Sequence, residues 1–363
     1  MILTIIAGAR PNFMKIAPII HAVQKAQAAG KNISYRLVHT GQHYDKNMSN
    51  TFFEELNIPK PDVNLGIGGG TQAEQTAGIM IALEKELLQN PTDLVVVVGD
   101  VTSTMACSIV AKKLHIKVAH VEAGIRSWDL TMPEEINRMV TDVLSDYYFT
   151  TSEVANINLK NAGVESKRIF FVGNVMIDTL IANMDRLNKP EIFDLLKLKE
   201  KEYLMLTLHR PANVDESGKL KALISEIVNN VQGLPVIFPI HPRTAKIFSE
   251  LRIQADNLYI VEPMGYLEFN YMVKRSKAVI TDSGGITEET TVMGIPCITL
   301  RNNTERPETC IIGTNELIGT TLGVIKPILD KLFSGNWKKG SIPELWDGKT
   351  SDRIIDIFLG LQL

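Results

Sequence analysis

LVVVVGDVTSTMACSIVAKKL (residues 94–114) contains one complete strand, turn and helix. The five apolar residues Leu94–Val98 are typical of a strand that is buried on both faces, as in a parallel sheet. Gly99 and Asp100 end this run, and Ser103–Leu114 then repeats apolar residues at helical spacing. The unit predicts an α/β protein in which parallel strands alternate with helices.

The same alternation extends in both directions along the chain. The expected strands are Leu3–Ala7, Tyr35–His39, Leu94–Val98, Val118–Val121 and Tyr147–Thr150 in the first half, and Tyr203–Leu208, Val236–Pro239, Leu258–Ile260, Ala278–Thr281 and Cys297–Leu300 in the second. The expected helices are Phe13–Ala28, Ala73–Leu88, Ser103–Leu114, Glu134–Leu144, Lys219–Asn229, Tyr266–Lys274 and Thr287–Met293. The two halves therefore predict two domains with a similar order of elements.

The change of domain is expected near Gly173. The residues that follow, 174–201, have a helical pattern without any strand signal, and they become more charged toward their end. We expect a first domain of residues 1–173 and a second of residues 174–349. The sequence contains no tandem repeat and no low-complexity tract, so the likeness of the halves lies in their element order alone.

Length and composition agree with two ordinary globular domains. The 363 residues are 45% hydrophobic and 22% charged, and 38 Lys and Arg stand against 41 Asp and Glu, for a formal net charge of -3. Because this balance supplies no general basic field, we expect no nucleic acid as a partner. The apolar runs are far shorter than the roughly 18 residues that a membrane span needs, so we expect no membrane segment. The apolar N-terminus also lacks the basic start and the length of a signal peptide.

The three cysteines, Cys107, Cys297 and Cys310, are scattered and show no CxxC spacing. An odd number of separated cysteines indicates neither a disulfide framework nor a zinc site. We therefore expect a protein of the reducing cytoplasm. No cluster of His and Cys has the spacing of metal ligands, so we expect no metal.

The loop after the first expected strand carries two cations. Gly8 permits close approach of a ligand, and Arg10 and Lys15 lie near the exposed amides of the following helix. Such a corner suits a phosphate or another anion. The same residues also fit a solvated turn with surface cations, so this loop is a weak signal by itself.

Three carboxylates occupy strand ends or a helix start in the first half. Asp100 follows Leu94–Val98, Glu122 follows Val118–Val121, and Glu134 lies in the first turn of the next helix. Any one of them also fits as a helix cap, a favourable first-turn acid or a member of a local ion pair. Because neighbouring parallel strands end at the same edge of a sheet, the three acids together form a candidate cluster for proton transfer.

The second half offers a histidine loop and a small-residue loop. His209 ends one strand, and His241 with Arg243 repeats this arrangement after the next. Imidazole exchanges protons near neutral pH, although a single histidine at a strand end is often structural. Ser283, Gly284 and Gly285 separate a strand from a helix, and such small residues let a diphosphate reach the backbone amides of a helix N-terminus. A purely structural tight turn is the alternative.

Eight motifs together resemble those of a known family. They are GARPNFMK (8–15), TGQHYD (40–45), VVGDVTS (97–103), HVEAGIRS (120–127), MPEEINR (132–138), TLHRPANVD (207–215), DSGGITEE (282–289) and TERPET (304–309). The chain resembles the non-hydrolysing UDP-N-acetylglucosamine 2-epimerases over nearly its whole length. The resemblance implies two Rossmann-like domains that face a central cleft, as in nucleotide-sugar glycosyltransferases of the GT-B type. It also implies that a C-terminal helix, at about residues 350–363, packs back on the first domain.

The resemblance further implies a reaction. In this family a base removes the proton at carbon 2 of the sugar, UDP leaves to give a 2-acetamidoglucal, and UDP adds again after protonation on the opposite face. No cofactor is expected, and the expected partners are a UDP-sugar substrate and a second copy of the chain in a homodimer. The departing diphosphate would need cations and amides to stabilise its charge.

The family's functional residues map onto positions of this sequence. The resemblance implies four catalytic residues: Asp100, Glu122, Glu134 and His209. It implies contacts to the substrate from Arg10, Lys15, Gln42, Arg138, His241, Arg243, Ser283, Gly284, Gly285, Glu289 and Arg306. We favour Asp100 and Glu122 for the two faces of the sugar, with Glu134 and His209 tuning or relaying, but the sequence leaves open which acid removes the proton.

Two loops depart from the pattern of many bacterial members. Gln42–Asp45 and His209–Asn213 differ from it, which puts an allosteric UDP-N-acetylglucosamine site in doubt. Both loops resemble the subgroup that epimerises UDP-2,3-diacetamido-2,3-dideoxyglucuronate for surface polysaccharide. The extra charge of that substrate would need another cation, for which Arg126, Arg210 and Arg243 are candidates. A glycosyltransferase and a catalytically silent nucleotide-sugar sensor are further alternatives, but the cluster of acids favours neither.

Overall fold

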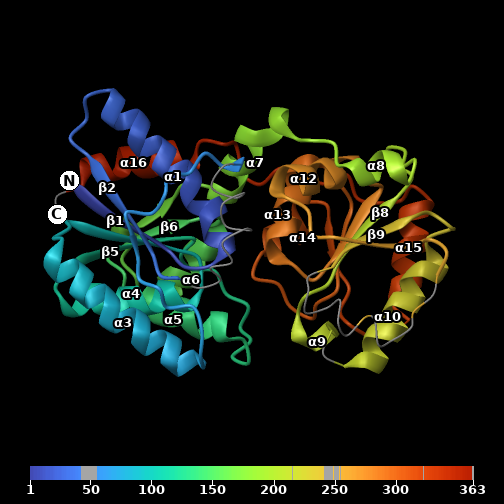
Figure 1. Ribbon diagram of the computed structural model, residues 1–363, viewed down its shortest axis with the longest axis horizontal. Helices are drawn as coiled ribbons and strands as arrows, with labels where there is room; N and C mark the ends of the chain where they lie inside the picture. The colour runs from blue at the N-terminus through green and yellow to red at the C-terminus, as the bar shows by residue number, and fades with distance from the viewer. Residues whose placement is uncertain are drawn as a thin grey trace. The chain divides into compact units, whose positions relative to one another are not determined.

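The computed structural model describes residues 1–41, 55–214, 216–240, 248, 253, 255–321 and 323–361. These residues form two compact units, Met1–Ala182 together with Glu344–Leu363, and Asn183–Pro343 (Figure 1). The chain thus passes from one unit to the other at Ala182 and returns at Pro343. The change of domain that the sequence places near Gly173 lies before helix α7 (Val175–Asn183), nearly all of which belongs to the first unit.

The first unit is built on a sheet of seven parallel strands. Its strand order is β3-β2-β1-β4-β5-β6-β7, so the chain starts in the middle, moves to one edge and then crosses back. The strands are β1 (Ile2–Ala7), β2 (Ser34–His39), β3 (Val63–Asn64), β4 (Leu94–Val98), β5 (Lys117–Val121), β6 (Tyr147–Thr150) and β7 (Ile169–Phe171). Between them lie the helices α1 (Arg10–Ala28), α3 (Gln72–Gln89), α4 (Thr102–Lys113), α5 (Pro133–Leu144) and α6 (Glu153–Asn161).

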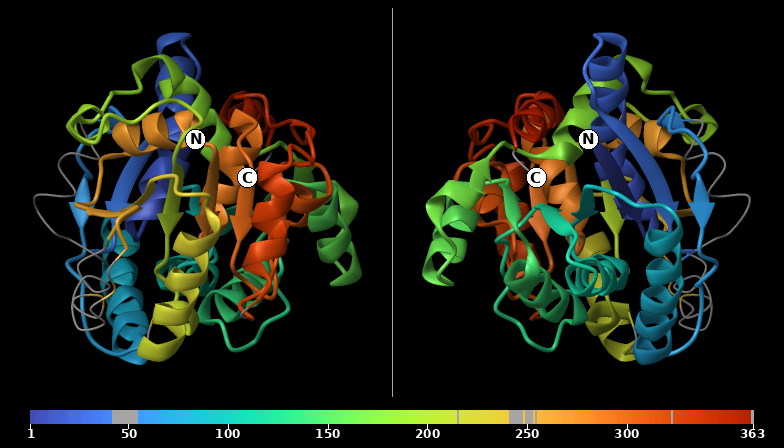
Figure 2. Two further views of the ribbon diagram at one scale, coloured as in Figure 1. Left: turned by 90° about the vertical axis from the view of Figure 1, so that its right-hand side faces the viewer. Right: turned by 90° about the vertical axis from the view of Figure 1, so that its left-hand side faces the viewer.

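Helices cover both faces of this sheet, which explains the continuous apolar strands. All five residues of β4 are buried, as expected for a central parallel strand. Val95 and Val97 pack with residues of α3 and α4, including Leu83 and Val110. α3 contacts α4, and α4 contacts α5. α1 packs against the C-terminal helix α16 (Thr350–Gly360) (Figures 1 and 2).

The C-terminal segment is tied to the first unit by buried polar contacts. Asp178 of α7 accepts hydrogen bonds from the backbone amides of Thr350 and Ser351 at 3.0 and 2.7 Å, which caps the start of α16. The indole of Trp346 donates to the carbonyl of Thr151 at 3.0 Å. The last segment therefore completes the first unit although it follows the second in sequence.

The second unit repeats the plan with six parallel strands. The order β10-β9-β8-β11-β12-β13 again starts in the middle of the sheet. The strands are β8 (Leu204–Thr207), β9 (Val236–Pro239), β10 (Leu258–Val261), β11 (Ala278–Thr281), β12 (Cys297–Thr299) and β13 (Asn315–Leu317). The helices are α8 (Glu191–Leu195), α9 (Pro211–Val214), α10 (Ser217–Asn230), α12 (Tyr266–Arg275), α13 (Gly284–Met293), α14 (Pro307–Ile311) and α15 (Ile325–Phe333).

Both strand orders are those of the Rossmann fold, which confirms the α/β class with two Rossmann-like domains. In each sheet the order reverses between the first and fourth strands, namely between β1 and β4 and between β8 and β11. Ligands of such sheets bind outside the C-terminal ends of the strands at this point. The candidate residues that follow β1, β4, β8 and β11 are therefore placed where a ligand is expected.

Candidate functional site

The loop after β1 is fixed to the end of β4 by one buried asparagine. Asn12 Oδ1 accepts the backbone amides of Gly8 and Ala9 at 3.2 and 3.0 Å, and its Nδ2 donates to the carbonyl of Val98 at 2.9 Å. These bonds let α1 begin at Arg10, three residues before the start expected from the sequence, with a proline in its first turn. The structure describes the backbone of Arg10 and not its side chain.

Lys15 and Glu122 form a buried ion pair at the ends of β1 and β5. The side chains are 13% and 1% exposed, and the ammonium Nζ of Lys15 donates to Oε2 of Glu122. Gly99, at the end of β4, has a φ of +71°, and a Cβ there would lie 2.9 Å from Nζ of Lys15. Glycine suits this position because it adopts the left-handed conformation without strain and leaves room for the ammonium of Lys15.

The backbone of Glu122 is itself in the left-handed region, with a φ of +70°. A residue with a side chain seldom adopts this conformation, and it persists only where the surrounding structure holds it. The amides of Glu122 and Ala123 both donate to the carbonyl of Phe149, at 3.0 and 3.1 Å, and hold the turn in place. The strained turn aims the carboxylate at Lys15.

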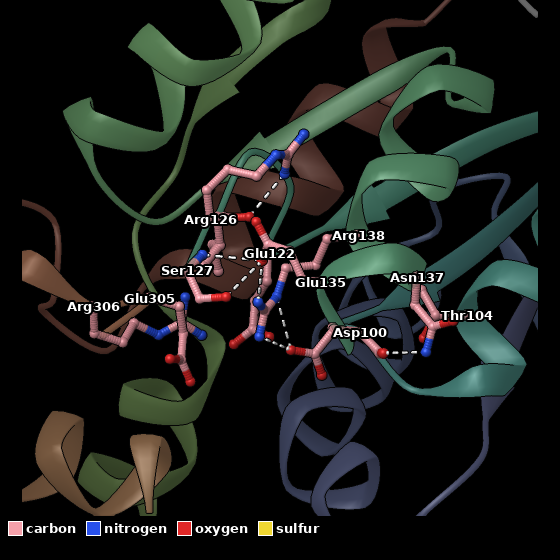
Figure 3. A network of polar contacts seen from close by, with 12 residues as sticks. Asp100, Thr104, Glu122, Arg126, Ser127, Glu135, Asn137, Arg138, Glu305 and Arg306 are labelled. Atoms are coloured by element: carbon pink, nitrogen blue, oxygen red, sulfur yellow. Dashed lines mark hydrogen bonds and ion pairs between the residues drawn. The ribbon is translucent and has the colours of Figure 1, made fainter. Parts of the chain in front are cut away.

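Asp100 is held by an arginine of α5. Arg138 donates from Nε and Nη2 to Oδ2 of Asp100 at 3.0 and 2.6 Å, and Asn137 donates to the Asp100 carbonyl at 2.9 Å. Arg138 is 3% exposed, whereas the Asp100 side chain is 29% exposed and reaches the surface. Figure 3 shows these side chains converging from the end of β4 and from α5.

A second acid, Glu135, binds Arg138 on its buried side. Glu135 is not among the candidate residues that the sequence predicts. Glu135 is fully buried and contacts Nη1 of Arg138 at 2.5 Å. It also accepts the amides of Ser127 and Trp128, both at 3.0 Å, as Figure 3 shows in part. Burial raises the pKa of Glu135, but the hydrogen bonds from Ser127, Arg138 and Trp128 outweigh it and the pKa is lowered. The neighbouring Glu134 is partly exposed.

A second buried network lies behind the acids. His120 of β5 is fully buried, with Nδ1 2.7 Å from Oδ1 of Asp142 and Nε2 2.9 Å from the carbonyl of Gly99. Nη1 of Arg126 lies 2.6 Å from the other oxygen of Asp142. Burial raises the pKa of Asp142, but the contacts with His120 and Arg126 dominate, and the pKa is lowered. This network fixes Gly99 and occupies Arg126, one of the expected cations for the substrate.

In the second unit, His209 contacts Asp282. Nδ1 of His209 lies 2.9 Å from Oδ1 of Asp282, and the two side chains are 54% and 0% exposed. The pair follows the adjacent strands β8 and β11. Asp282 opens the motif DSGGITEE, and no pattern in the sequence predicts a role for it.

The small-residue loop forms the N-terminus of α13. Ser283 is the N-cap residue, Gly284 begins the helix, and a Cβ at Gly284 would lie 2.7 Å from Oε1 of Glu305 and 3.7 Å from Nη1 of Arg301. The helix N-terminus favours an anion, whereas the charge of Arg301 is balanced by its ion pair with Glu305. Gly285 lies in the same first turn and is partly exposed.

Glu289 and Arg306 are both buried in the second unit. Glu289 accepts hydrogen bonds from Tyr266 Oη at 2.8 Å and from Asn270 Nδ2 at 3.4 Å, and burial raises its pKa to about 7. The guanidinium of Arg306 forms an ion pair with Glu288. Three other predicted contact residues, Gln42, His241 and Arg243, lie outside the described residues.

The structure therefore brings some of the candidates together in each unit. Lys15, Asp100, Glu122 and Arg138 lie together at the β4 and β5 ends, and His209 lies beside the β11 end that leads to Ser283 and Gly284. The described residues contain no group of three or more His, Cys, Asp or Glu that could hold a metal ion. Nor does any helix among them have the length and apolar character to cross a membrane.

Two parallel Rossmann-like sheets with charged side chains at the ends of their strands define the chain as an α/β enzyme of the nucleotide-binding architecture. A family model described as UDP-N-acetylglucosamine 2-epimerase matches residues 25–359. The chain belongs to this family, which confirms the resemblance of its motifs.

Relatives cover nearly the whole chain. The UDP-N-acetylglucosamine 2-epimerase of Methanocaldococcus jannaschii is 42% identical over 372 residues, with 98% of each protein covered. The UDP-2,3-diacetamido-2,3-dideoxy-D-glucuronate 2-epimerase of Pseudomonas aeruginosa is 41% identical over 329 residues, which cover 89% of this chain and 90% of that protein. A crystal structure of the M. jannaschii UDP-GlcNAc 2-epimerase in complex with UDP-GlcNAc and UDP matches 99% of this chain and 100% of its own with a TM-score of 0.88.

Proposed function

We propose that this protein is a non-hydrolysing epimerase that interconverts UDP-N-acetylglucosamine and UDP-N-acetylmannosamine by inverting carbon 2. Membership of the family and the 42% identity to the M. jannaschii enzyme support this substrate. The observation that carries the proposal is a pair of carboxylates at neighbouring strand ends, each bound by a cation. These are Glu122 with Lys15 and Asp100 with Arg138.

Two carboxylates suit a reaction that needs a base on one face of a sugar and an acid on the other. In the proposed sequence one carboxylate takes the proton from carbon 2, the electron pair forms the double bond between carbons 1 and 2, and the bond from carbon 1 to the UDP oxygen breaks. The other acid then protonates carbon 2 of the 2-acetamidoglucal from the opposite face, and the diphosphate oxygen adds again at carbon 1. We assign the two faces to Asp100 and Glu122, with Glu134 and His209 tuning or relaying protons.

Cations and amides would stabilise the diphosphate as it leaves. We assign this role to Lys15, to Arg10 and to the amides of Ser283–Gly285 at the start of α13, since preorganised donors act most strongly on charge that develops in the transition state. Glu289 would accept hydrogen bonds from the ribose. Further contacts with the substrate are assigned to Gln42, Arg138, His241, Arg243 and Arg306. The reaction involves no net oxidation, so no redox cofactor is required.

Isotope exchange tests this proposal. The purified protein is incubated with UDP-N-acetylglucosamine in deuterium oxide, and the products are followed by NMR and mass spectrometry. We expect UDP-N-acetylmannosamine with one deuterium at carbon 2. A product without deuterium would exclude the elimination route, and the absence of any epimer from a panel of UDP-2-acetamido sugars would exclude the function.

A second substrate, UDP-2,3-diacetamido-2,3-dideoxyglucuronate, is favoured by the 41% identity to the P. aeruginosa enzyme. Its carboxylate calls for a further cation. Arg126 is 6% exposed and lies 2.6 Å from Asp142, whereas Arg210 is 26% exposed and lies 3.9 Å from the carboxylate of Glu305. Arg210 is therefore the better candidate among the described residues. Arg210→Gln should then raise the KM of the uronate by about tenfold and leave that of UDP-N-acetylglucosamine within about twofold.

We also propose that the enzyme acts as a homodimer in the cytoplasm, in the synthesis of a surface polysaccharide. Its three cysteines are free thiols, as is usual in a reducing compartment. Ile136, Met139 and Val143 are exposed on one face of α5, and Ile136 also lines a shallow groove together with Met80 of α3 and Met105 of α4. A two-fold symmetric contact uses the same patch on both copies, and exposed apolar side chains beside a groove make this patch a self-complementary candidate. Val143→Glu should convert a dimer to a monomer in light scattering, and an unchanged mass would exclude this interface.

A further inference from the structure

Asp282 is a buried carboxylate to which the proposed reaction gives no role. It follows β11, and His209 lies just beyond the end of β8, the neighbouring strand. The register pairs Thr281 with Thr207, and the two threonine hydroxyls lie 2.6 Å apart. The strand ends are thus held side by side, which brings Asp282 to the imidazole of His209.

The described groups that contact the Asp282 carboxylate are all donors. Oδ2 accepts the amide of Arg210 at 3.0 Å and Nδ2 of Asn213 at 3.1 Å, while the amide of His209 lies 3.2 Å from both oxygens. Burial raises the pKa of Asp282, but the contacts from His209, Arg210 and Asn213 outweigh burial and lower it. A protonated Asp282 would turn a donor toward other donors, so the carboxylate is ionised.

Further charged groups lie next to the pair. Arg210 Nε donates to the carbonyl of Asp282 at 2.9 Å, and Nη2 of Arg210 lies 3.9 Å from Oε1 of Glu305. Glu305 in turn binds Arg301 at 2.6 Å. These contacts fix the main chain around the pair. Asp282 is the residue whose carboxylate contacts Nδ1 of His209.

An ionised carboxylate accepts hydrogen bonds and cannot donate them, so the hydrogen of a neutral His209 must lie on Nδ1. Nε2 then carries the lone pair. No described group makes a hydrogen bond to Nε2, and the His209 side chain is 54% exposed. The atom that can take or give a proton is therefore the one that faces outward.

The other carboxylate–histidine pair among the residues that the structure describes, His120 with Asp142, shows what a purely structural pair looks like. Both ring nitrogens of His120 are engaged, by Asp142 and by the carbonyl of Gly99, and the side chain is fully buried. His209 has the same carboxylate contact at Nδ1 but leaves Nε2 open. The second pair therefore leaves one ring nitrogen accessible to a ligand, whereas the first does not.

We propose that Asp282 is the positioning residue of His209, fixing its Nδ1–H tautomer and its ring so that Nε2 meets the substrate. This inference rests on the proposed epimerase function for the identity of the substrate. The tautomer of His209 does not depend on that function. Asp282 contacts no reacting atom. It acts through the imidazole, in the way that a buried carboxylate orients a catalytic histidine in general.

The tautomer is tested first, without any assay of activity. In protein labelled with ¹⁵N in its seven histidines, long-range ¹H–¹⁵N spectra distinguish the two tautomers, and His209→Asn assigns the resonance. We expect Nδ1–H for His209 in the wild type. In Asp282→Asn, the amide orientation that keeps the bonds from Arg210 and Asn213 turns its NH₂ toward Nδ1, so we expect Nε2–H. A wild-type His209 with its hydrogen on Nε2 would overturn the proposal, even if the variant did not fold.

A double-mutant cycle then separates positioning from stability. Asp282→Asn should lower kcat by about 100-fold or more, the usual contribution of a positioned acid or base, with KM within about threefold. In the His209→Asn background the same change should lower kcat by less than about threefold, because the group through which it acts is gone. Multiplicative losses in the double variant would show that Asp282 acts independently of His209 and would overturn the proposal. If the wild type epimerises no UDP-sugar, the proposed function fails, and the tautomer measurement alone decides this inference.

Discussion

Glu289→Gln should remove a large part of the pH dependence of stability. Glu289 is 4% exposed, and burial raises its pKa to about 7 from an ordinary value of 4.5, against the smaller effect of the bonds from Tyr266 and Asn270. Since the folded state holds this proton more tightly than the unfolded state, the stabilisation is fully present below pH 4.5 and is lost as the pH rises toward 7. The difference between the two pKa values corresponds to about 3 kcal/mol.

Urea unfolding at several pH values between 5 and 8 measures this effect. The glutamine amide is similar in size and its oxygen can accept the bond from Tyr266, so the variant should retain the contact without carrying a charge. The free energy of unfolding of Glu289→Gln, relative to the wild type, should increase by roughly 2–3 kcal/mol from pH 5 to pH 8. Glu262→Gln, at an exposed position, is the matched control and should show no such trend. A constant difference between Glu289→Gln and the wild type across this range would refute the reasoning.

Three further predictions concern the first unit. Asp100→Asn and Glu122→Gln should each lower turnover by about 100-fold or more while UDP still binds, and near-normal turnover would remove that residue from the mechanism. Lys15→Met should weaken UDP binding by about tenfold in calorimetry, the value of one charge-assisted hydrogen bond, and an unchanged affinity would show that Lys15 does not meet the diphosphate. Asp142→Asn leaves the buried guanidinium of Arg126 without its carboxylate and should cost about 3–5 kcal/mol in denaturant unfolding; a cost below about 1 kcal/mol would contradict the role of this network.

The fold could be predicted from the sequence because its signal is carried by whole segments. A run such as Leu94–Val98 is short, apolar at every position and rich in valine, which is typical of a strand covered on both faces. The strands that were missed, Val63–Asn64, Ile169–Phe171 and Asn315–Leu317, have two or three residues and lie at or next to sheet edges. So short an element is held by pairing with its neighbour, which leaves no periodic pattern in its own residues.

The sequence predicts the candidate residues that directly follow a strand. It does not predict the residues that hold those side chains in place. Asp100, Glu122 and His209 could be selected because a polar residue after an apolar run is conspicuous in the sequence. Glu135 could not be told from Glu134, since both lie in the first turn of α5 and either suits a helix start. The choice depends on direction: consecutive helical residues point about 100° apart, so Glu135 turns inward to Arg138 while Glu134 stays partly exposed.

The two histidines illustrate how a position along a strand decides the use of a side chain. His120 lies inside β5, so its ring is enclosed between the sheet and α5, where Asp142 and Gly99 occupy both nitrogens. His209 lies past the end of β8, beyond the enclosed layer, so only the nitrogen nearest the sheet finds a buried partner. Asp142 binds a histidine within the sheet, where both ring nitrogens have buried partners. Asp282 binds a histidine beyond the strand end, where Nδ1 has a buried partner and Nε2 can exchange a proton. Position inside the enclosed layer or past its edge thus separates these two histidines.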